Sequence, residues 1–497
     1  MTPRSNHANK AISGSLWMLS AAGARQALTL LFVFVLARIL TPDDYAAVAL
    51  VSAVTVILQA ISELGVSVAV IQRKKVDKRL LDSAFTLTFA LFAAAAVSLL
   101  LLARPFAHYY SLPLLAPLMY IAAATFFLQG VTSFYRSLLL RDLNFRTVSV
   151  TGLLATLMYG VTATVSAWLG HGAYSIMWGH LSEALLALFI FVLVQKFRPQ
   201  SLGTLRLMRE LLQFGVWIAL GRMLGQASGQ FDRFLIGKVL TAQALGGYYL
   251  AYRITTMLPN ILTGTLDQVL LPVYSGAKND AQVIERGYWR GLRLSAILFL
   301  PLSILITAYA RPLVWLTLGE KWMYIVPLVQ ILSIFGATQT LGGGIFASVI
   351  YASNIPQLNP LVNIFRIIVL PVCVWIGSRW GVEGVAWGLV AFGISGRFFN
   401  QWLLKRYLNY SFFQYFRETA VPIIVNMGLL VVGWLIANWI PITGMLLTGV
   451  YTGLAGLLTM SVYALLCKLA LPADTAYLVA QLQQLVRSKL RNISLKR

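Results

Sequence analysis

The sequence WMLSAAGARQALTLLFVFVLARILT, residues 17–41, is long and apolar enough to cross a bilayer, which takes about 20 residues. Arg25 and Gln26 stand near its middle. A charge at that depth costs at least about 2.5–3.5 kcal/mol on insertion scales, so an arginine inside a span indicates a role in function. We therefore interpret this stretch as a membrane span that carries the first candidate site residues.

The pattern of this stretch returns 200 positions later, in the pairs Trp17 and Trp217, Gln26 and Gln226, and 38–41 and 238–241. An internal repeat in a protein with many spans is typical of transporters, whose substrate binds between two related halves. We therefore expect two lobes with a cationic cavity.

The composition is that of an integral membrane protein. Of the 497 residues, 59% are hydrophobic and 11% are charged, and the mean hydropathy is +0.76, which lies outside the soluble globular classes. The net charge of +23 would suggest nucleic acid in a soluble protein. Here the basic residues are spread over short loops without a nucleic-acid-binding module, so we predict no nucleic-acid partner.

Fourteen apolar runs reach spanning length, which is about 17 residues or more. They cover approximately residues 14–37, 45–71, 83–103, 112–135, 147–169, 173–195, 211–236, 243–270, 294–310, 324–351, 359–378, 384–404, 419–439 and 443–467. With the N-terminus inside, 27 of the 39 basic residues fall in cytoplasmic segments and six on the opposite side, which is a strong positive-inside signal. The sequence predicts an all-α membrane protein with fourteen transmembrane helices and both termini cytoplasmic.

The segment 280–293, between two predicted spans, has a helical pattern of its own. Ile284, Tyr288 and Leu292 recur at helical spacing with charged residues between them. We interpret this segment as a cytoplasmic amphipathic connector that lies on the membrane surface.

The charged residues inside the predicted spans carry an excess of two positive charges. They are Arg25, Arg222, Arg233, Arg253, Arg366, Arg397, Glu63, Glu183, Asp232 and Asp267. Arginine suits a phosphate group because its planar fork donates two hydrogen bonds and keeps its charge. We predict a substrate-binding cavity formed by Arg25, Gln26, Glu63, Arg222, Gln226, Arg253 and Arg366.

A structural interpretation of the same charges stays open. Arg25 and Glu63 lie at similar estimated depths, about 16 Å and about 12 Å from the cytoplasmic side at about 1.5 Å per residue, so they can form an interhelical ion pair. Arg397 and Asp267 lie near enough to an interface to extend their charged ends into it.

The sequence gives no sign of catalysis or of a metal centre. Cys373 and Cys467 lie far apart in apolar runs, and the four histidines do not cluster with carboxylates or cysteines at metal-ligand spacing. There is no GxxxxGK[ST] loop and no long outer loop with paired carboxylates. We predict no catalytic residue, no metal and no cofactor, with a proton or sodium gradient as a candidate energy source.

Several motifs resemble one family along nearly the whole chain. They are Gly14-Ser15-Leu16-Trp17, LARILTPDDY (36–45), SELGVSVAVIQRK (62–74), LLLRDLNFR (138–146), FDRFLIGKVL (231–240), LGGYYLAYRI (245–254), LGEKW (318–322) with Pro327, and GVEGVAWG (381–388). The chain resembles the polysaccharide transporter (Wzx-type flippase) family of the multidrug/oligosaccharidyl-lipid/polysaccharide exporter superfamily, especially the colanic acid and teichuronic acid exporters. Ala46 departs from the glycine expected there, which affects the local turn only.

The resemblance implies two six-helix lobes, related by an axis along the membrane normal, plus two C-terminal helices. We place the lobes at residues 1–209 and 210–406, the extra helices at 407–470 and a cytoplasmic basic tail at 471–497. It also implies alternating access driven by an ion gradient or the membrane potential. Lipid II flippases use arginines in the central cavity, and Arg25 resembles the one on their first helix.

From these observations we predict a flippase in a bacterial inner membrane. Its cargo would be an undecaprenyl-pyrophosphate-linked oligosaccharide for surface polysaccharide, either exopolysaccharide, capsule or O-antigen. The expected partners are this lipid-linked oligosaccharide, membrane lipid and the polysaccharide polymerase machinery. The alternatives are a small-molecule exporter of the same superfamily, against which the excess of buried arginine argues, and a membrane-embedded polymerase or ligase, which would need a catalytic outer loop.

Overall fold

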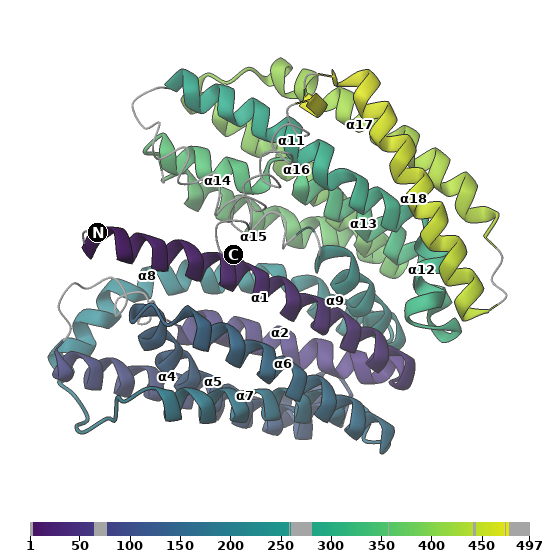
Figure 1. Ribbon diagram of the computed structural model, residues 1–497. Coiled ribbons are helices and arrows are strands. Elements are labelled where there is room, and N and C mark those ends of the chain that lie inside the picture. Colours follow the sequence, from purple (N-terminus) through teal and green to yellow (C-terminus); the bar gives the residue numbers. More distant parts are fainter. Residues whose placement is uncertain are drawn as a thin grey trace, which may run out of the picture. The chain divides into compact units, whose positions relative to one another are not determined.

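The computed structural model describes residues 3–63, 77–257, 259, 281–355, 357–440, 444–472 and 474–476. These residues are almost entirely helical, and no strand occurs among them. The chain forms two compact units, Met1–Leu250 and Ala251–Arg497 (Figure 1). The predicted boundaries at 209 and 406 stay predictions, and most of the predicted tail, 477–497, lies outside the described residues.

The first unit contains the helices α1 (Pro3–Ile39), α2 (Pro42–Ser62), α4 (Lys78–Tyr109), α5 (Leu115–Arg141), α6 (Phe145–Trp168), α7 (Tyr174–Val194), α8 (Leu205–Gly229) and α9 (Phe231–Val239). A further helix covers residues 242–257 and begins in this unit. α4 packs on α5, α5 on α7, α7 on α6, and α6 on α1, and Figure 1 shows α4 to α7 side by side. α2 contacts α4, α5, α8 and α9.

Glycines allow the helices of this unit to approach closely. A Cβ on Gly160 of α6 would overlap the Phe32 ring of α1, and one on Gly130 of α5 would overlap the Phe92 side chain of α4. Small residues at such interfaces are how helices pack in a membrane, where lipid supplies no hydrophobic drive for association.

The sequence repeat corresponds to two similar turns in the structure, one between α1 and α2 and one between α9 and the 242–257 helix. α1 ends at Ile39, and Thr41 caps α2 through a capping box with Asp44. α9 ends at Val239, and the Thr241 hydroxyl likewise accepts a hydrogen bond from the Ala244 amide at 3.2 Å. The two stretches therefore have the same local role, namely a short turn whose threonine starts the next helix.

The run predicted as one span at 211–236 is interrupted. α8 ends at Gly229 and α9 starts at Phe231, with Gln230 between them outside helical geometry. Eleven stretches of the described chain are long and apolar enough to cross a membrane by length and composition, and two of them, Glu320–Ala352 and Leu358–Leu408, hold more than one helix. The count of fourteen spans stays a prediction.

The second unit contains α11 (Ala281–Ala308), α12 (Ala310–Thr317), η1 (Glu320–Ile325), α13 (Val326–Thr340), α14 (Gly343–Ala352), α15 (Leu358–Gly377), η2 (Ser378–Trp380), α16 (Gly381–Leu408), α17 (Phe412–Asn438) and α18 (Met445–Ala470). α11 packs against α13 and α17, α13 against α16, and α16 against α15. α17 packs against α18.

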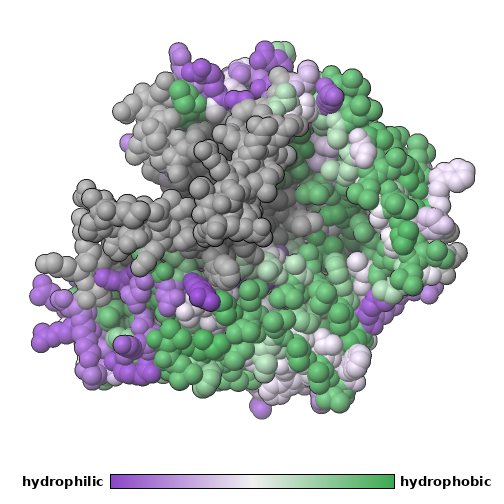
Figure 2. All heavy atoms as spheres, in the orientation of Figure 1, coloured by the Kyte–Doolittle hydropathy of each residue, from purple (hydrophilic) through white to green (hydrophobic). Residues whose placement is uncertain are grey.

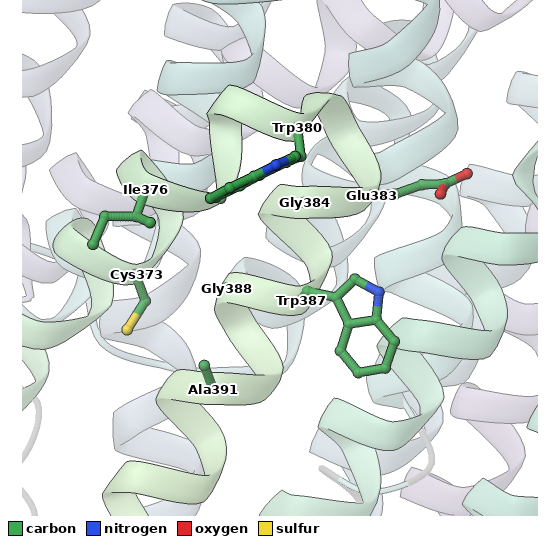
Figure 3. Close-up of a pocket in the computed structure, with 9 residues that line it drawn as sticks. Cys373, Ile376, Trp380, Glu383, Gly384, Trp387, Gly388 and Ala391 are labelled. Atoms are coloured by element: carbon green, nitrogen blue, oxygen red, sulfur yellow. The ribbon is translucent and has the colours of Figure 1, made fainter.

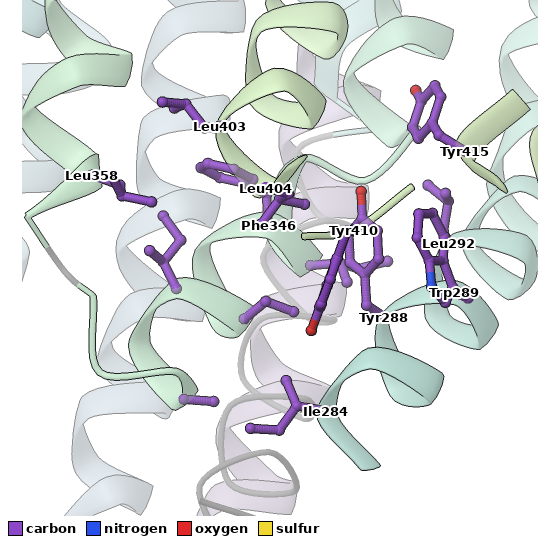
Figure 4. Packing of buried hydrophobic residues seen from close by; sticks show 14 residues of the cluster. Ile284, Tyr288, Trp289, Leu292, Phe346, Leu358, Leu403, Leu404, Tyr410 and Tyr415 are labelled. Atoms are coloured by element: carbon purple, nitrogen blue, oxygen red, sulfur yellow. The ribbon is translucent and has the colours of Figure 1, made fainter. Parts of the chain in front are cut away.

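The predicted surface connector at 280–293 is wrong as a separate element. Its described part is the first half of α11, and Ile284, Tyr288 and Leu292 are buried in a core with Leu403 and Leu404 of α16 (Figure 4). The Tyr288 hydroxyl donates a hydrogen bond to Gln401 Oε1 at 3.0 Å. Helical spacing was predicted correctly, but the apolar face packs on protein and not on lipid.

Large hydrophobic side chains remain exposed on the flanks of the helices. Leu101 of α4 and Leu193 of α7 expose 72% and 65% of their surface. Figure 2 shows hydrophobic residues along the helices and hydrophilic ones gathered near helix ends. Exposed apolar surface on this scale indicates contact with lipid.

Gly160→Ala tests the close packing of α1 on α6. The added methyl group would collide with the Phe32 ring, and overpacking of this kind costs about 1–3 kcal/mol. The same change at Gly221 of α8 adds a methyl group with nothing within 4 Å. We expect a lower Tm in detergent for the Gly160 variant only, and equal Tm values for both variants would contradict the packing described.

Candidate functional site

A cavity of about 230 Å³ that has both polar and apolar lining residues lies in the first unit. α2, α5 and α7 form its walls, and Tyr249 of the 242–257 helix completes the lining. Its polar side chains are Ser52, Thr55, Gln59, Thr125, Gln129 and His180. Polar side chains inside a membrane fold commonly face a water-filled cavity or each other, so this cavity is the first candidate site.

One face of α2 carries polar residues from the cavity to the end of the helix. Ser52, Thr55, Gln59 and Glu63 follow one another at spacings of three, four and four, which places them on the same side of the helix. Gln59 Nε2 donates a hydrogen bond to Glu63 Oε1 at 2.9 Å. The polar face therefore continues without a break from the cavity to Glu63 at the C-cap of α2.

Two arginines act on the same end of α2. Arg136 of α5 lies within electrostatic range of both Glu63 and Arg25. The Arg25 side chain extends over Gly152 of α6, where Nη1 is 3.7 Å from the position a Cβ would take. Both arginines are exposed, and no ion pair within 4.0 Å joins Arg25 to Glu63 among the described residues. Arg136 therefore lies near one carboxylate and one further guanidinium group, so positive charge is in excess at this end of the polar face of α2.

The cavity wall on α7 carries an ionisable pair. His180 Nδ1 lies 3.4 Å from Glu183 Oε2, and the His180 ring lies 4.7 Å from the Tyr159 ring of α6. The ring of Tyr249, which also lines the cavity, has the Arg233 guanidinium 5.1 Å from its centroid. Titratable groups therefore lie at two positions along the cavity lining.

The structure places the predicted site residues in both units. Gln26 follows Arg25 on α1 and is half-buried, and Arg222 and Gln226 lie one turn apart on α8 with exposed side chains. Arg253 and Arg366 belong to the second unit, where Arg253 is half-buried and Arg366 is exposed on α15. The electrostatic contact through Arg136 groups Arg25 with Glu63; the full set of seven stays a prediction.

Sequence reasoning missed Arg136, Gln59, Gln129 and His180. Arg136 was assigned to a loop because the apolar run ends at residue 135, whereas α5 continues to Arg141. The signal for Gln59 was the shared face of Ser52, Thr55, Gln59 and Glu63, which a search for charges does not detect. Gln129 and His180 lie on α5 and α7, and no pattern in the sequence links them to that face. Within the described ranges, no group of three or more His, Cys, Asp or Glu residues is placed to hold a metal.

A second cavity, of about 460 Å³, lies in the second unit between α15 and α16. In Figure 3, Cys373 and Ile376 of α15 lie on the left, and Glu383 and Trp387 of α16 lie on the right. Trp380 and Trp387 expose 71% and 52% of their surface, as aromatic residues do at a membrane interface. The charged side chain that lines this cavity, Glu383, would repel an anion, so the cavity does not suit a phosphate group.

Comparison with known proteins now assigns the chain to a family. Residues 35–327 match the model of a family described as polysaccharide biosynthesis proteins. The chain belongs to this family. It is 24% identical over 429 residues to the lipopolysaccharide biosynthesis protein WzxC of Escherichia coli, covering 86% of this chain and 87% of that protein.

Two further matches extend the comparison. The chain is 24% identical over 384 residues to the teichuronic acid biosynthesis protein TuaB of Bacillus subtilis, covering 76% and 79% of the two chains. Its fold is that of the lipid II flippase MurJ, with a TM-score of 0.70 at 12% identity over 91% of this chain and 98% of that one. The family resemblance drawn from the sequence motifs is confirmed.

Cysteine labelling tests whether the polar face of α2 meets water. In a background with Cys373 and Cys467 replaced by alanine, we expect Thr55→Cys and Gln129→Cys to react with a charged methanethiosulfonate reagent in membranes. Ala53→Cys is the matched control, because Ala53 lies on the same helix with 0% exposure. Rates as slow as that of Ala53→Cys at both positions would show a dry cavity.

Proposed function

We propose that this protein moves an undecaprenyl-pyrophosphate-linked oligosaccharide from the cytoplasmic to the outer leaflet of a bacterial inner membrane. The observation that carries the proposal is the positive charge at the end of the polar face of α2, where Arg136 lies within electrostatic range of both Glu63 and Arg25 in a membrane fold. A pyrophosphate needs such partners, because guanidinium groups donate paired hydrogen bonds and stay charged. The relatives are named for polysaccharide biosynthesis, and the protein of like fold is named as a lipid II flippase.

In this proposal the fold has fourteen spans with both termini cytoplasmic. Two six-helix lobes alternate access to the cargo, and the two C-terminal helices stand beside them. Arg25, Arg222 and Arg253 attract the pyrophosphate while the cavity faces the cytoplasm, and the lipid tail stays in the bilayer. The protein is a transporter rather than an enzyme, as the fold and the relatives indicate. A proton or sodium gradient and the polymerase machinery are its proposed energy source and partner.

Lipid analysis of cells that lack the protein tests the function. We expect an undecaprenyl-pyrophosphate-linked oligosaccharide to accumulate on the cytoplasmic leaflet and to disappear when the intact gene is restored. Accumulation on the outer leaflet would indicate a polymerase or ligase instead. No accumulation, together with altered drug tolerance, would indicate a small-molecule exporter.

Arginine variants test the binding of pyrophosphate. Each charge-assisted hydrogen bond contributes about 1.5–3 kcal/mol, so we expect Arg25→Ala, Arg136→Ala and Arg222→Ala each to reduce export about 10- to 100-fold at equal protein level. Arg104→Ala is the control, because Arg104 is an exposed arginine of α4 in the same unit. Full export by the first three variants, measured as polysaccharide at the cell surface, would refute this assignment.

A further inference from the structure

The cavity lined by α2, α5 and α7 differs in chemistry from the end of the polar face of α2 near Arg25 and Arg136. Apart from the imidazole of His180, its polar lining consists of hydroxyl and amide side chains, together with the phenol of Tyr249. Among the residues that the structure describes, no arginine or lysine lines it. A site built for a phosphate would place cations in the wall, so this cavity suits a neutral polar group.

The hydrogen-bonding groups in the wall are partly unused. The hydroxyls of Ser52, Thr55 and Thr125 donate to carbonyls of their own helices at 2.9, 3.0 and 2.9 Å, which leaves their lone pairs as acceptors. Gln59 uses one amide hydrogen on Glu63 and retains its carbonyl oxygen and its second amide hydrogen. The wall therefore offers both donors and acceptors.

Aromatic side chains complete the wall beside these polar groups. Phe126 is buried at 2% exposure and Tyr249 at 7%, and both line the cavity. A sugar ring combines hydroxyls, which both donate and accept, with an apolar face of C–H groups that packs on an aromatic ring. Drug-sized ligands need pockets of roughly 300–1,000 Å³. The cavity volume of about 230 Å³ is smaller and suits one sugar ring.

The spacing along α2 fits a cargo with two chemically different parts. Thr55 lies eight residues before Glu63, which is about 12 Å along a helix at about 1.5 Å per residue. A pyrophosphate held at Arg25 and Arg136 therefore leaves room for its attached sugars to reach the cavity. The charged part and the neutral part would lie along the same helix face.

We propose that this cavity is a subsite for one neutral sugar ring of the cargo and that Thr55 and Gln129 are residues that bind it. This inference rests on the proposed function and adds where the sugar is recognised. It predicts that discrimination between oligosaccharides is governed by this cavity, whereas affinity for the pyrophosphate is governed by the arginines.

Binding to the full-length protein in nanodiscs tests the subsite. The probes are undecaprenyl pyrophosphate alone and the same lipid carrying one glucose or one N-acetylglucosamine. We expect at least one sugar-bearing probe to bind more tightly than the sugar-free lipid. Because a neutral hydrogen bond is worth about 3- to 10-fold in affinity, Gln129→Leu and Thr55→Val should each remove that much of the sugar advantage and leave binding of the sugar-free lipid unchanged.

Matched variants separate the subsite from a general loss of folding. Thr55→Ser keeps the hydroxyl and should keep the sugar advantage, and Gln213→Leu places the same substitution on an exposed position of α8 and should change nothing. Arg25→Ala should weaken all three probes by the same factor.

Three results would contradict the subsite proposal, and each can be told apart from the result that would contradict the proposed function. The subsite fails if sugar-free lipid binds tightly but neither sugar adds affinity. It also fails if the sugar advantage survives in Gln129→Leu and Thr55→Val, or if Gln213→Leu abolishes it equally. If no probe binds and Arg25→Ala has no effect, the flippase proposal itself fails.

Discussion

A charged side chain in a membrane must find water, a counter-charge or a ligand, and this requirement governs the first unit. Arg25 is exposed, on a helix whose neighbouring face is sealed by contacts such as Phe32 on Gly160. Arg136 lies within electrostatic range of one counter-charge, Glu63, and of a second cation, Arg25. The remaining positive charge makes this end of α2 suited to an anion that arrives and leaves.

The sequence predicted the helices well because lipid demands long apolar runs, and it predicted Arg25 and Glu63 because charges stand out within such runs. It placed Arg136 outside a span, since an apolar run does not show where a helix continues into polar sequence. It did not find the cavity, because each hydroxyl or amide alone is equally consistent with an interhelical hydrogen bond. Only the arrangement of α2, α5 and α7 in space shows that Thr55, Gln129 and His180 line one cavity.

The interruption between α8 and α9 has a local physical reason that the apolar pattern hides. Asp232 is 3% exposed, and a buried carboxylate needs hydrogen-bond donors. A helix start leaves backbone amides without helical partners, and the Arg233 amide donates to Asp232 Oδ1 at 2.9 Å. The Tyr248 hydroxyl supplies a further donor to the same carboxylate. Starting a new helix at Phe231 therefore supplies the buried Asp232 side chain with a backbone donor that a continuous helix would commit to a carbonyl four residues earlier.

The helices that follow the two matching turns, at Thr41 and Thr241, pack against each other near the start of α2. Gly246 lies so close to the carbonyl of Pro42 that a Cβ there would overlap it, and the Tyr45 and Tyr249 rings have centroids 6.4 Å apart. Tyr249 also lines the cavity. A ring that fills the cavity therefore touches a side chain that packs at the turn between α1 and α2. Because α2 begins at this turn and ends at Glu63, one helix links the neutral cavity, the positive cluster and the contact between the two repeats.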